Sequence, residues 1–226
     1  WTDAAALPVA LTTEHDALVT QAGFTAGQRV LVTGASSGVG MIAVQMAAAL
    51  GAAQVIATTT SAGKRDAIAA TGADVVVDTS TESLADVVRA ATGGDGVDVV
   101  LDHVGGPLVN DLLASTRPLG TIVNIGRLGG RTGTIDLDQL AFRRLRLIGT
   151  TFSIRTADER AAVAAALVPE VLPAVAAGRI RPVVDDVIPF HDAPRAAERM
   201  RSNTAVGKLV LDLGGLHGPD PAAGTP

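Results

Sequence analysis

The amino-acid sequence predicts an α/β fold built on a doubly wound parallel sheet. Short apolar, β-branched runs alternate with helix-like segments through the first 150 residues, which is the order expected of repeated strand–helix units. These runs also lack strict alternation of polar and apolar residues. That pattern is typical of parallel strands whose two faces are both covered by helices.

The elements are expected in a regular order along the chain. Strands are predicted at residues 29–33, 54–58, 74–77, 97–101, 120–125 and 145–150, and helices follow the first four strands at 38–50, 62–70, 84–91 and 108–115. The first 25 residues hold one helix-like run. The later segments are an Ala-rich helix over 157–177 interrupted near Pro169 and Pro173, an extended segment at 181–189, a helix at 191–201 and a final strand at 208–213.

The composition narrows the classes of function. The net charge is −5 and no run of Lys or Arg forms a basic stripe, so nucleic acid is not expected as a partner. Cysteine is absent, which excludes disulfides, thiolate ligands and a cysteine nucleophile and fits a reducing cytoplasm. Nothing in the sequence reads as a signal peptide or membrane helix. The four histidines, His15, His103, His191 and His217, are scattered, so no metal site is expected.

A glycine-rich turn, TGASSGVG at residues 33–40, lies between the first predicted strand and the helix that follows it. Glycines in this position let the backbone turn tightly and approach a pyrophosphate, which then binds the N–H groups at the helix N-terminus. No Gly-Lys-Ser/Thr sequence follows, so a Walker-type phosphate loop is excluded. The turn therefore predicts dinucleotide binding in a Rossmann-type domain.

The segment after the second predicted strand favours NADPH over NADH. NAD-binding domains usually place a carboxylate about 20 residues beyond the glycines to bind the ribose 2′-hydroxyl. Here the hydroxyls of residues 58–61 precede Lys64 and Arg65, and the first acidic residue after Gly40 is Asp66. Cations at this position suit a 2′-phosphate, which a carboxylate would repel. The alternative is that the two cations form a solvated helix face.

The turn also resembles the start of a short-chain dehydrogenase, but those enzymes use a Tyr-x-x-x-Lys pair and this sequence has no tyrosine. Taken together, several stretches resemble the zinc-free quinone oxidoreductase branch of the medium-chain dehydrogenase/reductase superfamily. They are AAALPVALTTEHDAL (4–18), VLVTGASSGVG (30–40), TTTSAGKRDAIAATGADVVVD (58–78), GVDVVLDHVGG (96–106), GTIVNIG (120–126), FRRLRLIGTTFSIRT (142–156), GRIRPVVDDVIPF (178–190) and AVGKLVLDL (205–213).

The resemblance implies a set of cofactor-binding residues and leaves the catalytic residues unknown. The turn would hold the pyrophosphate, the segment after the second strand would hold the 2′-phosphate, and later loops would supply backbone contacts to the nicotinamide. The expected residues are Thr13, Gly34, Ser36, Ser37, Gly38, Val39, Gly40, Thr60, Ser61, Lys64, Val104, Asn124, Ile125, Gly126, Phe152, Ser153 and Asn203. Thr13 could instead cap a helix, and Phe152 could be a core residue.

The resemblance also implies the organisation of the chain. We expect a junction helix region at 1–25, a dinucleotide-binding domain at 26–156, a C-terminal helix and return segment at 157–213, and a disordered tail at 214–226. Relatives begin with a GroES-like catalytic domain, of which only a remnant is expected here. Either the chain is an excerpt, or a separate polypeptide supplies that domain.

The expected function is cofactor binding in an NADPH-dependent oxidoreductase that transfers hydride to a small-molecule quinone or α,β-unsaturated carbonyl. We expect a cytoplasmic protein with no membrane partner that forms a homodimer through the edge strand at 145–151. The alternatives are a non-catalytic dinucleotide-sensing or interaction module, and RNA binding, which the acidic net charge disfavours.

Overall fold

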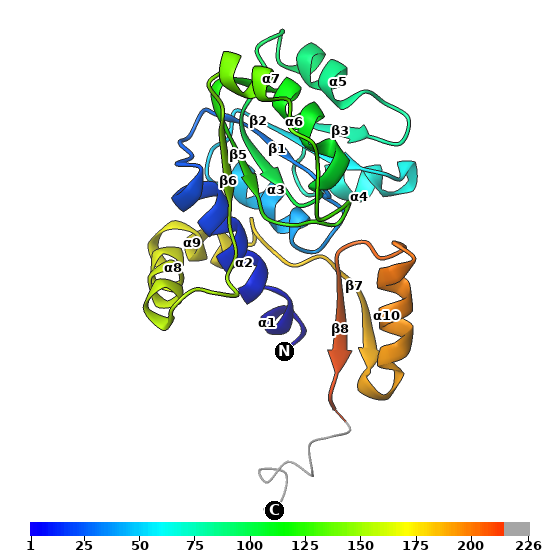
Figure 1. Cartoon of the computed structure of the whole chain (residues 1–226). Helices are drawn as coiled ribbons and strands as arrows, with labels where there is room; N and C mark the ends of the chain where they lie inside the picture. Colours follow the sequence, from blue (N-terminus) through cyan, green and yellow to red (C-terminus); the bar gives the residue numbers. More distant parts are fainter. Residues whose placement is uncertain (215–226) are drawn as a thin grey trace, which may run out of the picture.

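The computed structural model describes residues 1–214, and its centre is a six-stranded parallel sheet (Figure 1). The strands are β1 (Arg29–Val32), β2 (Gln54–Thr59), β3 (Val75–Asp78), β4 (Val97–Asp102), β5 (Thr116–Asn124) and β6 (Arg146–Gly149). Their order in the sheet is β3-β2-β1-β4-β5-β6, so the chain changes direction between β1 and β4. Ligands of such sheets bind beside the carboxyl ends of the strands at this switch point. The predicted fold class is confirmed.

Helices cover both faces of the sheet, and alternate residues of each strand enter different cores. Val30 and Val32 pack into one core with α2 (Pro8–His15) and α3 (Gly40–Ala49). Leu31 faces the other core, which contains residues of α5 (Leu84–Ala91) and α6 (Val109–Ser115). Burial on both faces explains why these strands read as continuous apolar runs in the sequence.

Short elements complete the two layers. They are α1 (Thr2–Ala6), the π-helix η1 (Asp16–Gln21), η2 (Ala62–Lys64), α4 (Arg65–Ala69), η3 (Gly106–Leu108) and α7 (Leu137–Phe142). The helix-like run expected in the first 25 residues is thus divided into α1, α2 and η1. None of the described helices is long and apolar enough to cross a membrane.

After the sheet, the chain forms two helices and a second, smaller unit. The helix predicted over 157–177 is divided into α8 (Ala157–Glu170) and α9 (Leu172–Ala176), with Pro169 in the last turn of α8. β7 (Val184–Pro189), η4 (Phe190–Asp192), α10 (Ala193–Arg201) and β8 (Lys208–Asp212) follow. β7 and β8 pair in parallel as a separate sheet that projects from the main body beside α1 (Figure 1).

Most boundaries differ from those predicted by a few residues, and two of the differences have a clear structural cause. α3 begins at Gly40 and not at residue 38, because residues 34–39 form the turn. β5 begins at Thr116 and not at residue 120, and its pairing with β4 shifts register where Leu119 takes a positive φ of 65°. Such an irregularity removes the local pattern on which strand prediction depends. The disorder expected for the tail falls on residues 215–226, outside the described range.

Candidate functional site

The glycine turn follows the carboxyl end of β1, at the switch point of the sheet. Gly34 has φ +58°, and the Oγ of Ser37 accepts a hydrogen bond from the N–H of Gly40 at 3.0 Å. A Cβ on Gly40 would lie 2.6 Å from the carbonyl oxygen of Gly34, so a side chain there would force the turn open. Ser36, Gly38 and Val39 occupy the same turn, and Val39 precedes the first residue of α3. All the expected pyrophosphate residues therefore lie at one helix N-terminus.

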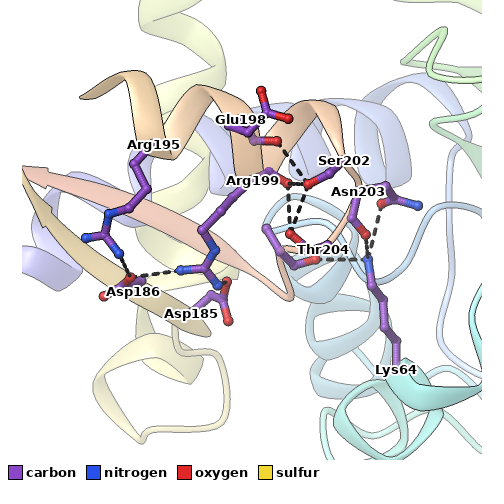
Figure 2. A network of polar contacts seen from close by, with 10 residues as sticks. Lys64, Asp185, Asp186, Arg195, Glu198, Arg199, Ser202, Asn203 and Thr204 are labelled. Carbon is purple, nitrogen blue, oxygen red and sulfur yellow. Dashed lines mark hydrogen bonds and ion pairs between the residues drawn. The ribbon is translucent and has the colours of Figure 1, made fainter. Parts of the chain in front are cut away.

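The predicted 2′-phosphate residues lie beyond β2, where Lys64 is buried. Thr60 is exposed and Ser61 is half-buried at the start of η2. The Nζ of Lys64 donates to the carbonyl oxygen of Asn203 at 2.7 Å, to its Oδ1 at 3.2 Å and to the carbonyl oxygen of Ala205 at 3.0 Å (Figure 2). Burial lowers the pKa of Lys64, and the charge of Asp185 opposes that shift. The structure thus joins two predicted residues 139 positions apart.

The segment that contacts Lys64 belongs to the smaller unit at residues 184–212, called the C-terminal unit below, and the rest of that unit holds it in place. Arg199 of α10 pairs with Asp186 at 2.8 Å and with Asp185 at 2.5 Å, which fixes the helix against β7 (Figure 2). Asn203 follows this helix with φ +52°, a left-handed conformation that Asn tolerates better than most residues. Ser202 and Thr204 both donate to the carbonyl oxygen of Arg199.

Arg65 does not act together with Lys64. Its guanidinium pairs with Glu82 and donates to the carbonyl oxygen of Val76 at 2.5 Å. Neither cation is a freely solvated side chain, so the solvated-face alternative is wrong for Lys64, which is 6% exposed. The two cations were read as one basic pair, but they serve separate contacts.

The C-terminal unit also touches the glycine turn. The N–H of Gly207 donates to the carbonyl oxygen of Ser36 at 2.9 Å, and the side chain of Lys208 passes over Gly38. Burial lowers the pKa of Lys208. One segment, residues 203–208, therefore contacts the turn and the predicted 2′-phosphate site together.

On the far side of the glycine turn from Lys64, Asp102 joins the ends of three strands. It is 1% exposed, and its Oδ1 accepts hydrogen bonds from Thr33 Oγ1 and from the N–H groups of Val104 and Gly105, each at 3.0 Å. Its Oδ2 accepts from Asn124 Nδ2 at 2.9 Å. The backbone carbonyl of Asp102 accepts from the N–H groups of residues 125 and 126 at 2.8 and 3.1 Å. Val104, Asn124, Ile125 and Gly126, four predicted nicotinamide-side residues, are thereby organised around a carboxylate that was not predicted.

His103 turns its ring into the protein interior. Nδ1 donates to the carbonyl oxygen of Thr33 at 2.8 Å, so Nε2 shares a proton with the buried carboxyl group of Glu14 at 2.8 Å. Burial lowers the pKa of His103, but the charge and hydrogen bond of Glu14, with the Thr33 and Asp102 contributions, raise it overall above its ordinary value. The pair attaches α2 to the ends of β1 and β4. Thr13, which precedes Glu14, lies inside α2, so Thr13 is not a helix cap.

Phe152 and Ser153 lie in a turn after β6. Phe152 is half-buried, and the guanidinium of Arg155 lies over its ring, 4.6 Å from the centroid. The N–H of Ser153 bonds to Thr151 Oγ1 at 3.2 Å. Arg155 pairs with the buried Asp16 at 2.5 Å. Phe152 is therefore not fully exposed. It is also not a core residue, so the alternative interpretation of Phe152 is wrong.

A cavity of about 280 Å³ opens at the carboxyl ends of β4, β5 and β6. Asp102, Asn124 and the loop at 130–133 line it, with Arg127 and Arg131 beside them. A second hollow, lined by Arg29, Asp98 and Arg117, lies at the opposite, amino edge of the sheet. Only the first of these two is on the side where parallel sheets bind ligands.

The buried polar residues of this end escaped sequence reasoning. Asp102, Asp16 and Arg155 drew no prediction, and His103 is expected only as one of four scattered histidines that form no metal site. One signal was available: residues 12–16 (TTEHD) are five successive polar residues between the apolar Leu11 and Ala17. Five successive residues cover the whole circumference of a helix, so some of them face the interior of a packed helix.

Comparison with known proteins agrees with this geometry. Residues 38–167 match the family model described as zinc-binding dehydrogenase. The chain belongs to this family. Within it, the chain is similar to the quinone oxidoreductase-like proteins of the medium-chain dehydrogenase/reductase superfamily and corresponds to their cofactor-binding portion. Across residues 1–214, no group of three or more His, Cys, Asp or Glu residues is arranged to hold a metal ion.

Individual family members resemble the chain over most of its length. Quinone oxidoreductase-like protein 2 of Bos taurus is 30% identical over 211 residues, which are 93% of this chain and 60% of that protein. Mycoketide-CoA synthase of Mycobacterium tuberculosis is 34% identical across 99% of this chain, which spans 5% of the synthase. A mycobacterial protein solved in complex with NADPH has a TM-score of 0.81 and 32% identity, covering 93% of this chain and 64% of that one. The chain therefore spans less than two thirds of these relatives.

Proposed function

We propose that the chain is the NADPH-binding part of an oxidoreductase that reduces a quinone or an α,β-unsaturated carbonyl. The observation that carries this proposal is the arrangement of groups along the carboxyl edge of the sheet. A tight glycine turn lies at its centre, Lys64 meets Asn203 at one end, and the Asp102 network orders the loops at the other. The bovine quinone oxidoreductase-like relative and the mycobacterial complex with NADPH support the same assignment.

The turn fits a pyrophosphate. Close approach of a phosphate to backbone N–H groups requires that the turn carry no protruding side chains, and Gly38 and Gly40 carry none, although the side chain of Lys208 lies over Gly38. Helix α3 runs for 10 residues from Gly40 and has no acidic residue in its first turn. Its N-terminal partial positive charge is therefore available to a diphosphate.

The segment that follows the carboxyl end of β2 fits a 2′-phosphate. The described segment between Gly40 and Asp66 contains no carboxylate that would repel one. An ammonium has three N–H donors, and those of Lys64 already contact Asn203 and Ala205. A phosphate bound beside Ser61 and Lys64 would share or replace one of these contacts, so NADPH binding and docking of the C-terminal unit are coupled through one ammonium group.

The bound nicotinamide would supply the hydride, and the chain supplies orientation and a dry surface. We propose that Asn124, Gly126 and the turn holding Phe152 and Ser153 orient the ring. The buried Glu14–His103 pair and the Asp102 hydrogen bonds keep these loops in one arrangement. We propose that the proton for the reduced product comes from water or from a group outside this chain, so the chain alone binds cofactor with little turnover.

Parallel titrations of the 226-residue chain with NADPH and NADH, followed by nicotinamide fluorescence, test this function. We expect tighter binding of NADPH. Replacing Lys64 with Met should weaken the binding of NADPH about tenfold, which corresponds to about 1.4 kcal/mol. The binding of NADH should weaken less, because only NADPH carries the 2′-phosphate. Arg89→Met, which removes an exposed ion pair on α5, is the matched control.

Equal losses for the two cofactors in Lys64→Met would mean that Lys64 holds the C-terminal unit and does not recognise the phosphate. Preference for NADH would overturn the choice of cofactor. Binding of neither cofactor by the unaltered chain would contradict the proposed function and favour a non-catalytic module.

We also propose that two copies associate through β6. This strand is at the edge of the sheet, and Phe142 and Ile154 on either side of it are 87% and 86% exposed. An unpaired edge beside apolar side chains is a surface suited to a second copy. Sedimentation equilibrium at micromolar concentration should give a dimer mass that falls to the monomer mass in Gly149→Pro, which removes an N–H group from the free edge of β6. A monomer mass for the unaltered chain would contradict this.

A further inference from the structure

Three consecutive polar residues at the junction of α2 and η1 are almost completely buried. Glu14 and Asp16 are 0% exposed and His15 is 1% exposed. Each reaches a different part of the chain: Glu14 contacts His103 after β4, His15 contacts Glu170 at the end of α8, and Asp16 contacts Arg155 after β6. Asp16 is also the first residue of the π-helix η1, a geometry that occurs often at functional sites.

The Asp16 contacts reach the turn that carries Phe152 and Ser153. Oδ2 of Asp16 accepts from Thr150 Oγ1 at 2.9 Å and from Arg155 Nη2 at 2.5 Å. Arg155 continues into the turn, because its Nε donates to the carbonyl oxygen of Thr151 at 3.1 Å and its guanidinium covers the Phe152 ring. One buried carboxylate thereby determines the shape of residues 150–155.

The ion pair is a costly way to hold a turn. Asp16 is buried and the Arg155 side chain is 15% exposed, so both charges lose hydration, and an apolar pair of similar size often stabilises a fold as well or better. A planar guanidinium adds what an apolar pair lacks, namely directional contacts to a carboxylate, a backbone carbonyl and an aromatic face at once. This combination fixes a backbone conformation, and the exposed neighbours Thr151, Ser153 and Ile154 supply no comparable restraint.

We infer that Asp16 and Arg155 are positioning residues that set the 150–155 turn for the nicotinamide half of the cofactor. This inference rests on the proposed function. The same helical segment carries Thr13 and Glu14, so the junction helix aligns the turn after β6 and the end of β4 on one support. The two residues act through Phe152 and Ser153 and do not themselves contact the cofactor.

The test compares two ligands that share an adenosine half. The 226-residue chain and its Arg155→Met variant are titrated with NADPH and with 2′,5′-ADP, which lacks the nicotinamide, by calorimetry. We expect NADPH to bind about tenfold more weakly to the variant, corresponding to about 1.4 kcal/mol. Binding of 2′,5′-ADP should be unchanged. Arg89→Met, which breaks an exposed pair of the same kind on α5, should change neither affinity.

Two further variants keep the test decisive if Arg155→Met folds poorly. Arg155→Lys retains the charge but loses the planar fork, and Asp16→Asn retains an oxygen for Thr150 but loses the charge. Both should weaken NADPH alone, by less than Arg155→Met. Equal losses for the two ligands, or no loss of NADPH binding in any variant, would overturn the inference. Failure of the unaltered chain to bind either ligand would overturn the proposed function as well.

Discussion

Along the carboxyl edge of the sheet, the proposed adenosine end at Lys64 and the proposed nicotinamide end at Asp102 are built in different ways. At the adenosine end, Lys64 extends from the segment after β2 to carbonyl oxygens of the C-terminal unit, and the residues around it, such as Thr60 and Asn203, are exposed. At the nicotinamide end, Asp102, His103 and Asp16 are buried and hold loops from beneath. One end can adjust at the surface, whereas the other is set by the interior.

This difference has an energetic consequence. A buried polar group that loses its partner costs the full penalty of desolvation, while an exposed one is solvated by water instead. Substitutions at the nicotinamide end should therefore destabilise the fold as well as the site. Substitutions of the exposed residues at the adenosine end, such as Thr60 and Asn203, should change binding with little effect on stability, whereas Lys64 is itself buried.

The largest effect is expected at Asp102. Asp102→Ala would leave Thr33 Oγ1, Asn124 Nδ2 and two backbone N–H groups without their acceptor. We expect the free energy of unfolding to fall by roughly 3 kcal/mol or more, as measured by urea denaturation. Asp102→Asn keeps one oxygen acceptor and should cost less. A loss below about 1 kcal/mol in Asp102→Ala would show that water replaces these bonds and would remove the contrast between the two ends.

The sequence predicted most of the fold because its signals are local. The six strands, the glycine turn and the helix interruption near Pro169 all follow from patterns within about ten residues. Residues at the adenosine end, such as Lys64, could also be proposed from their spacing beyond the turn. The partners of Asp102 and Asp16 could not, because Asp16 meets Arg155 across 139 positions of sequence. From the sequence alone, a carboxylate at the end of a strand that is buried in the fold cannot be distinguished from one that is exposed.

The start of β5 is a second feature that local sequence patterns did not predict. Residues 116–119 contain Arg117 and Pro118, which do not resemble a buried strand, and yet they begin β5. Arg117 pairs with Asp98 at 2.5 Å, and Arg143 donates to the carbonyl oxygen of Thr116 at 2.9 Å. These contacts with other segments hold a stretch that its own propensity does not specify.

A smaller effect, dependent on pH, is expected at His103. Its pKa is raised in the folded chain, so the stabilisation from its protonated form is fully present below the ordinary value of 6.5 and is lost as the pH rises through the raised pKa. His103→Gln should therefore lower the free energy of unfolding more near pH 6 than at a pH above the raised pKa. Denaturation curves across this range measure the difference. A difference that is the same at every pH would mean that folding does not raise the pKa of His103.

The smallest effect is expected at Arg199, in the C-terminal unit. Its pairs with Asp185 and Asp186 are partly exposed, so Arg199→Met should cost no more than about 1 kcal/mol. NADPH should bind only slightly more weakly, because Lys64 can still meet the segment at 203–205. Thermal denaturation and a fluorescence titration of the same sample check both points. A loss as large as that of Asp102→Ala would show that this end is as rigid as the other.

A crystal structure of the chain with NADPH would test the central claim most directly. We predict that the pyrophosphate lies at residues 36–40, that a 2′-phosphate oxygen lies within about 3.2 Å of Lys64 Nζ, and that the nicotinamide lies beside Asn124 and the Phe152 turn. Residues around Asp102 should keep the contacts described here, while the segment at 203–205 shifts to share Lys64. A 2′-phosphate away from Lys64, or loops rearranged around Asp102 with the Lys64 contacts unchanged, would contradict it.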